Sequence, residues 1–246
     1  KTNKSFYNEI KELDFATNLI FKDGSLNKYK YWKPEYKPSN ISECDAIEGV
    51  KHYLSRSLQL RLRSDVPLAF CLSGGVDSSS LVSIASKELN YDIASFSIID
   101  SDKRYNELAN IEATINDTGC VNHKIFLDPE ANNLARLENL VNYHDSPVAT
   151  ISYLIHSMIS EEIANHGYKI SVSGTGADEL FTGYYDHFNL HMFEIKDESD
   201  FSSYLKDWES HVLDYVRNPM LKKHDLYFEN PSYRDHVYLN NDHFSK

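Results

Sequence analysis

Cysteine is scarce in this sequence: Cys44, Cys71 and Cys120 are the only three among 246 residues. Because their number is odd and their spacing is wide, the pattern indicates neither a disulfide framework nor a zinc cluster. Free thiols are typical of a reducing compartment, so we expect a cytoplasmic protein.

Long apolar runs and an excess of basic residues are also missing. No stretch of the chain approaches the roughly 18 apolar residues of a membrane-spanning helix. The chain has 25 Lys and Arg against 37 Asp and Glu, which gives a net charge of −12, whereas a nucleic-acid-binding domain is normally basic. We therefore expect neither a membrane nor a nucleic acid as partner.

Glycine is sparse as well, with nine residues, yet two short stretches hold several of them. The first stretch, residues 73–79, reads Ser-Gly-Gly-Val-Asp-Ser-Ser and follows an apolar run. This order predicts a strand, an anion-binding loop and the start of a helix. Since the carboxylate of Asp77 would repel a phosphate, the stretch indicates a polyphosphate bound together with a divalent cation such as Mg²⁺. The alternative is a plain tight turn in which Asp77 only caps the helix.

The second stretch, residues 173–184, reads Ser-Gly-Thr-Gly-Ala-Asp-Glu-Leu-Phe-Thr-Gly-Tyr and has the same character. Its Asp178 and Glu179 could cap a helix and match its dipole. We favour the interpretation that Asp77 and Asp178 share one Mg²⁺ on a pyrophosphate group. His187 and His191 have the i, i+4 spacing of metal ligands on a helix, but no third ligand is in view, so we predict no zinc site.

Apolar periodicity predicts strands that alternate with helices around these two stretches. We expect strands at 66–72, 93–99, 121–127 and 168–172, and helices at 42–62, 76–90, 107–118, 134–141, 151–163 and 201–215. The alternation predicts an α/β fold, a mainly parallel sheet with helices on both faces. If the four strands have the spatial order 3-2-1-4, both glycine-containing stretches flank one crevice at the carboxyl ends of the strands.

The first stretch resembles the pyrophosphate loop of the ATP pyrophosphatase superfamily, which GMP, NAD, argininosuccinate and asparagine synthetases share. The second resembles the other signature of the glutamine-dependent asparagine synthetases and of their relative, β-lactam synthetase. The resemblance covers about residues 39–190. It implies an ATP-dependent amide-forming ligase in which an aspartate-like carboxylate is adenylated, pyrophosphate is released, and ammonia or an amine then attacks.

The resemblance also implies residue roles and domains. ATP and Mg²⁺ are the expected cofactors, Asp77 and Asp178 the metal ligands, and Thr175 a further catalytic position. The residues expected to bind ATP are Leu72, Ser73, Gly74, Gly75, Asp77, Ser78, Ser79, Ile98, Ser173 and Gly174. Residues 1–38 would be the end of a glutaminase domain with its linker, 39–190 the synthetase domain, and 191–246 an incomplete helical extension.

Three departures from the family pattern qualify this assignment. The chain has no N-terminal nucleophilic cysteine, and no distal lysine is recognisable before Lys246. Both departures would be explained if the chain is a piece of a longer protein. Such a piece alone should be inactive on glutamine and should receive ammonia from a glutaminase domain. A homodimer is also expected. The third departure lies in the site itself, since Thr175 stands where asparagine synthetases usually place Glu.

Two alternatives stay open. One is a related amide-forming enzyme with a carboxylate substrate other than aspartate, and the other is a nucleotide-binding domain without catalysis.

Overall fold

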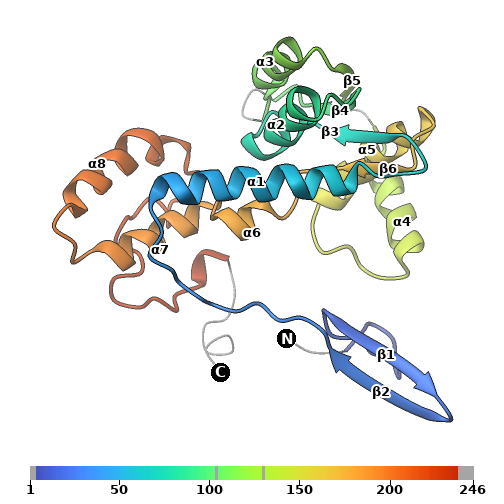
Figure 1. Cartoon of the computed structure of the whole chain (residues 1–246), viewed down its shortest axis with the longest axis horizontal. Helices are drawn as coiled ribbons and strands as arrows, with labels where there is room; N and C mark the ends of the chain where they lie inside the picture. The colour runs from blue at the N-terminus through green and yellow to red at the C-terminus, as the bar shows by residue number, and fades with distance from the viewer. Residues whose placement is uncertain (1–3, 103–104, 129–130, 238–246) are drawn as a thin grey trace. The chain divides into compact units, whose positions relative to one another are not determined.

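The fold is organised around one parallel sheet (Figure 1). The computed structural model describes residues 4–102, 105–128 and 131–237 and divides into two compact units, residues 1–173 and 174–246. The sheet lies in the first unit, and its strands are β3 (Leu68–Cys71), β4 (Ala94–Ile99), β5 (Val121–Phe126) and β6 (Ile170–Val172). Their order is β5-β4-β3-β6, and all three pairings are parallel. This is the 3-2-1-4 order under which both glycine-containing stretches follow neighbouring strands.

Helices cover both faces of the sheet, as the alternation of strands and helices predicts. On one face, Phe70 and Leu72 pack with buried residues from α1 (Glu43–Arg61), α2 (Val76–Ser83) and α3 (Leu108–Thr118). On the other face, Ala69 and Phe96 pack with Ile159 and Ile163 of α5 (Ser152–Asn165). Helix α4 (Asn133–His144) packs beside α5.

Helix boundaries follow from particular side chains. Ser42 is the N-cap of α1, and its hydroxyl oxygen accepts the N–H of Asp45 at 3.1 Å. Gly119 ends α3 with φ of +69°, a left-handed conformation that glycine adopts without a steric cost. The helix that begins with α2 continues through η1, a π-helical turn at Ile84–Glu88 that periodicity alone does not reveal.

The N-terminal region forms a two-stranded antiparallel hairpin from β1 (Thr17–Lys22) and β2 (Ser25–Lys30). It turns at Asp23 and Gly24, both of which have positive φ angles. Large apolar side chains of the hairpin are exposed, among them Phe21 at 72% and Leu26 at 57%. A hairpin of two strands is at best marginally stable by itself in water.

The second unit is helical. It contains α6 (Ala177–Phe181), α7 (Tyr185–Ile195), α8 (Phe201–His211) and two 3₁₀ turns, η2 (Leu213–Tyr215) and η3 (Asp235–Val237). The sequence predicts α8 and η2 as one helix but does not indicate α7. A buried position of α7 is Asn189, whose amide donates to the carbonyl oxygens of Leu221 and Lys223 at 3.2 and 2.6 Å. A search for apolar residues at helical spacing does not recognise Asn189 as a buried position, and therefore does not predict α7.

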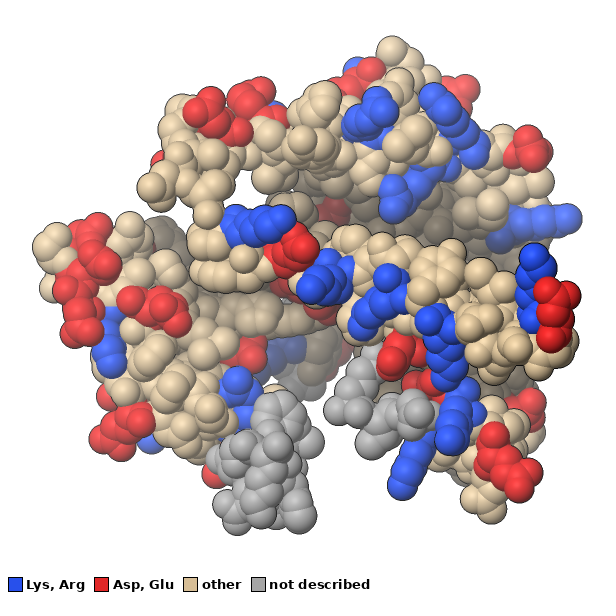
Figure 2. Space-filling model, turned by 60° about the horizontal axis from the view of Figure 1, so that its bottom comes forward, with Lys and Arg blue, Asp and Glu red and all other residues tan. Residues whose placement is uncertain are grey.

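Charges of both signs are mixed on the protein surface. On the face drawn in Figure 2, Lys and Arg side chains lie among Asp and Glu side chains. The net charge of −12 therefore does not make this face uniformly acidic. Within the described ranges, no helix has both the length and the apolar composition needed to cross a membrane.

Candidate functional site

The first loop leaves the sheet between β3 and α2, at the carboxyl end of the central strand. The N–H of Leu72 donates to the carbonyl oxygen of Phe96 at 2.9 Å and so extends the β3–β4 pairing by one residue. Gly74 then adopts φ of +84°, and a Cβ placed on it would lie 2.9 Å from Cβ of Glu107. Both the conformation and the lack of space require glycine at this position.

Ser78 holds this loop in shape. The residue is 5% exposed, and its Oγ accepts the N–H of Ser73 at 3.1 Å and donates to the carbonyl oxygen of Gly75 at 3.2 Å. The Ser73 hydroxyl lies 3.1 Å from the same Oγ and also accepts the Gly75 N–H at 3.3 Å. The hydroxyl of Ser78 is thus engaged within the loop, whereas Ser73 is exposed and Ser79 is partly exposed.

Helix α2 starts where the loop ends. Its N-cap is Gly75, and no side chain caps it, so the alternative in which Asp77 is the N-cap is wrong. Asp77 instead lies in the first turn and is half-buried. The N–H groups of a first helical turn have no partner within the helix, and together with the helix dipole they favour an anion.

The second loop starts at the same edge of the sheet as the first loop. Strand β6 pairs in parallel with β3, so both strands end at the same edge of the sheet, and Ser173 follows directly. Residues 174–177 form a turn in which the N–H of Ala177 donates to the carbonyl oxygen of Gly174 at 3.2 Å. Gly176 has φ of +96° and ψ of −4°, as the third residue of a type II turn requires. Thr175 is the second residue of this turn and is exposed.

The two acidic residues of the second loop have separate local partners. The carboxylate of Asp178 lies over Gly183, where a Cβ would come within 1.6 Å of its Oδ1. The Tyr184 hydroxyl donates to Oε1 of Glu179 at 2.6 Å. This hydrogen bond lowers the pKa of Glu179 and raises the pKa of Tyr184 to about 12. Helix α6 is capped by Gly176 with no side-chain hydrogen bond, so neither acid is its N-cap.

Ile98, which the family resemblance places beside adenosine, lies on β4 opposite Ile125 of β5. Its side chain joins the apolar cluster on the α5 face. The neighbouring Ser95 and Ser97 point to the opposite face, where both are fully buried and both accept the side-chain amide of Asn122 at 2.9 Å. Ile98 therefore lies on the apolar α5 side of β4, together with Phe96, and not on the side of the two serines.

Asp77 and Asp178 belong to the two different compact units, so their sharing of one metal ion stays a prediction. Among the residues that the structure describes, no three His, Cys, Asp or Glu side chains form a group that could hold a metal ion. The last stretch of the chain, residues 238–246, which includes Lys246, lies outside the described residues.

Glu107 is a neighbour of the first loop that the sequence pattern does not single out. It follows β4 and precedes α3, and its Cβ and carbonyl oxygen crowd the Cα of Gly74. Partial burial raises the pKa of its carboxyl group. No residue type or spacing marks this contact, because it depends on how the β4–α3 connection folds back onto the loop.

Comparison with known proteins assigns the chain to a family. The asparagine synthase family model matches residues 49–237. The chain is 32% identical over 162 residues to the glutamine-hydrolysing asparagine synthetase 1 of Bacillus subtilis, and 29% identical over 217 residues to amidase chyE of Penicillium rubens. These matches cover 66% and 80% of this chain, but the chain spans only 25% and 32% of the two relatives.

Among solved structures, the chain resembles the NH₃-dependent NAD synthetase of Campylobacter jejuni, with 16% identity and a TM-score of 0.38. That match covers 78% of this chain and 96% of the other. The family match spans the sheet, both loops and the helices that follow them. The chain therefore belongs to the asparagine synthase family.

Proposed function

We propose that this chain is the ATP-binding synthetase module of an asparagine-synthetase-like amidotransferase. In this reaction a carboxylate, aspartate or a similar acid, is adenylated by ATP with release of pyrophosphate, and ammonia or an amine then attacks. The observation that carries the proposal is the first loop. Its backbone turns at Gly74 into a helix start that no side chain caps, which leaves the loop surface open to an anion.

The phosphates of ATP suit this loop because hydroxyl and N–H donors are among its accessible groups. The Ser73 and Ser79 hydroxyls and the first-turn N–H groups of α2 would hold the pyrophosphate portion. Ile98 and Gly174 would border the adenosine, next to Leu72 and Ser173 at the ends of β3 and β6. We retain Ser78 and Gly75 in the site as residues that shape the loop.

Asp77 explains why a divalent cation belongs to the proposal. A half-buried carboxylate in the first turn of α2 would repel the phosphates of ATP. Bound Mg²⁺ supplies positive charge between carboxylates and phosphates. Asp77 and Asp178 are the residues that would hold it, and their carboxylates and the phosphate oxygens are the ligands that Mg²⁺ prefers.

The hairpin supports a glutaminase domain as the source of ammonia. Its strands have almost no buried position, although they carry Leu19, Ile20 and Phe21 on one side of the turn and Leu26 on the other. Such surfaces are normally covered. We propose that residues 1–38 complete a glutaminase domain, that residues 39–190 form the synthetase domain, and that residues 191–246 begin a helical extension.

A second candidate function differs from the first in its carboxylate substrate. Thr175 replaces the glutamate that asparagine synthetases usually have, and chyE, a relative that matches 80% of this chain, is named an amidase rather than an asparagine synthetase. An amide-forming enzyme with a carboxylate other than aspartate is therefore the second candidate. We place either reaction in the cytoplasm, since Cys44, Cys71 and Cys120 are free thiols.

Calorimetry with MgATP tests the proposal directly. The wild-type chain should bind MgATP, and Asp77→Asn and Asp178→Asn should each weaken binding at least tenfold, about 1.4 kcal/mol or more. Asp65→Asn is the matched control, because Asp65 is exposed and lies before β3, at the end of the strand away from the loop. Absence of MgATP binding would overturn the nucleotide site, and unchanged affinity in both aspartate variants would overturn the metal assignment alone.

A further inference from the structure

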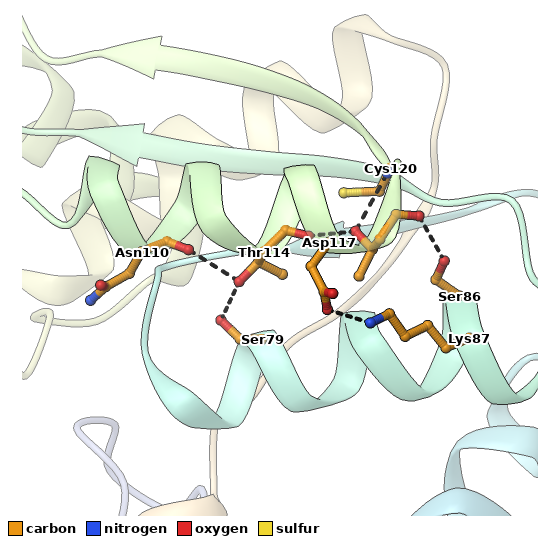
Figure 3. Close-up of polar contacts among 8 residues, drawn as sticks. Ser79, Ser86, Lys87, Asn110, Thr114, Asp117 and Cys120 are labelled. Atoms are coloured by element: carbon orange, nitrogen blue, oxygen red, sulfur yellow. Dashed lines mark hydrogen bonds and ion pairs between the residues drawn. The ribbon is translucent and has the colours of Figure 1, made fainter.

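Polar contacts join α3 to the helix that starts at the first loop (Figure 3). The Thr114 hydroxyl lies 3.1 Å from Oγ of Ser79 on α2. Farther along, the Ser86 hydroxyl donates to the carbonyl oxygen of Thr118 at 3.0 Å, and Nζ of Lys87 donates to Oδ2 of Asp117 at 2.5 Å. These contacts fix α3 against α2 and η1 and begin within one turn of the loop itself.

Thr114 has one hydroxyl hydrogen and two acceptors within reach. One acceptor is Oγ of Ser79, and the other is the carbonyl oxygen of Asn110, one turn earlier in α3, also at 3.1 Å. A threonine inside a helix often donates to the carbonyl four residues before it. Here the second acceptor is a hydroxyl of the helix that carries the candidate phosphate loop.

The consequence falls on Ser79. When Thr114 donates to Oγ of Ser79, one lone pair of that oxygen is occupied and the Ser79 hydrogen must point elsewhere. In the described part of the chain, the hydrogen-bond partner of the Ser79 side chain is Thr114, which acts as the donor. No protein group accepts the hydrogen of the Ser79 hydroxyl there. The neighbouring Ser78 hydroxyl is engaged within the loop, whereas the Ser79 hydroxyl, one residue later in α2, keeps its hydrogen for a ligand.

We propose that Thr114 is a positioning residue for the phosphate site. It orients the Ser79 hydroxyl so that its hydrogen is donated to a phosphate oxygen of the bound nucleotide. A hydroxyl that accepts one hydrogen bond is polarised and donates a stronger one, and a bond to a charged phosphate oxygen gains most from this. The inference rests on the proposed function, since it requires that Ser79 contact the phosphates.

A double-mutant cycle on the full chain tests the inference, with MgATP affinity measured by calorimetry. Thr114→Val keeps the shape of the side chain and removes the hydroxyl, and it should weaken MgATP binding about three- to tenfold. Thr114→Ser should restore most of the affinity. Thr118→Val is the matched control, because Thr118 lies one turn later in α3 and its hydroxyl donates to the Thr114 carbonyl oxygen rather than to α2.

The cycle separates positioning from general support of the fold. Ser79→Ala should weaken binding, and in that background Thr114→Val should have no further effect. Equal losses from Thr114→Val in both backgrounds, a loss in Thr118→Val of the same size, or full affinity in Thr114→Val would each overturn the inference. If Ser79→Ala binds MgATP as tightly as wild type, Ser79 is outside the phosphate site and the inference is wrong. A wild-type chain that binds no MgATP would overturn the proposed function itself and the inference with it.

Discussion

The Tyr184 hydroxyl donates to Oε1 of Glu179 across 2.6 Å, which links the first turn of α6 to the residue before α7. This relationship bears on which group could act as a base in the second loop. The hydrogen bond lowers the pKa of Glu179, and a carboxylate with a lowered pKa is a weaker general base. On the proposed function, Glu179 is therefore a poor substitute for a glutamate at the position of Thr175.

Tyr184→Phe should raise the pKa of Glu179 toward the ordinary glutamate value, near 4.3. Because the folded-state pKa is lowered, the hydrogen bond adds stability above the unfolded-state pKa and loses it as the pH falls through the folded-state pKa. A carboxyl NMR titration measures the shift, and Tyr185→Phe is the control. The same Glu179 titration in wild type and Tyr184→Phe would contradict the assignment.

Thr182 lies in the left-handed region, with φ of +62° and ψ of 63°, at the end of α6. This conformation costs an L-residue about 1–2 kcal/mol and is rare for a β-branched side chain. Thr182→Gly should raise the free energy of unfolding by about 1 kcal/mol, measured by urea titration. Thr182→Ala should give no such gain, since alanine retains the same Cβ. A loss of stability in the glycine variant would show that the Thr182 side chain contributes more than the backbone strain costs.

Ser78→Ala should destabilise the first unit. The substitution removes the hydroxyl that accepts the Ser73 N–H and donates to the Gly75 carbonyl oxygen, which costs about 0.5–1.5 kcal/mol for each hydrogen bond lost. Ser80→Ala, in the same helix and partly exposed, should change the free energy of unfolding by less than about 0.5 kcal/mol. If the two variants have equal stability, the Ser78 network does not hold the loop.

The sheet could be predicted from the sequence because β3 is a buried apolar run, because strand-forming and helix-forming segments alternate after it, and because β3 and β6 lead directly into the two glycine-containing loops. Sequence order and the rule for parallel strands also placed both loops at one edge. The role of Ser78 could not be predicted, since the spacing Ser-Gly-Gly-Val-Asp-Ser-Ser does not show which hydroxyl points inward. The contacts of Glu107 with Gly74 and of Thr114 with Ser79 could not be predicted either, because they depend on tertiary packing.

Glu107→Gln should stabilise the folded chain at neutral pH. Partial burial beside the loop raises the pKa of Glu107 above its unfolded value, so the folded state favours the neutral carboxyl. The stability from this group is present below the unfolded pKa and is lost as the pH rises through the folded pKa. The variant should therefore unfold at a higher temperature than wild type at pH 7, and the difference should vanish below about pH 4. Glu138→Gln on the exposed side of α4 is the control, and an advantage that persists in acid would point to another cause.

We propose that Thr175 affects which amide-forming reaction a protein with this chain catalyses. Its exposed side chain projects from the turn of residues 174–177, in the loop that follows β6. A glutamate there could accept N–H bonds from the incoming amine or take its proton, a role worth roughly 10²- to 10⁴-fold in rate. A threonine hydroxyl can orient an amine weakly and is not a base at neutral pH.

On the proposed function, Thr175→Glu should raise ammonia-dependent asparagine formation in an active protein that contains this chain. The measurement is asparagine formed per AMP released. Thr175→Gln is the control, because glutamine can accept N–H bonds but cannot take a proton. A gain in both variants would assign the position to amine binding, and a gain in the glutamate variant alone would assign it to proton transfer. The opposite result would be rapid asparagine formation by the wild-type protein, at a rate that Thr175→Glu leaves unchanged or lowers. It would show that threonine suffices at this position, and that the carboxylate of another residue serves the amine.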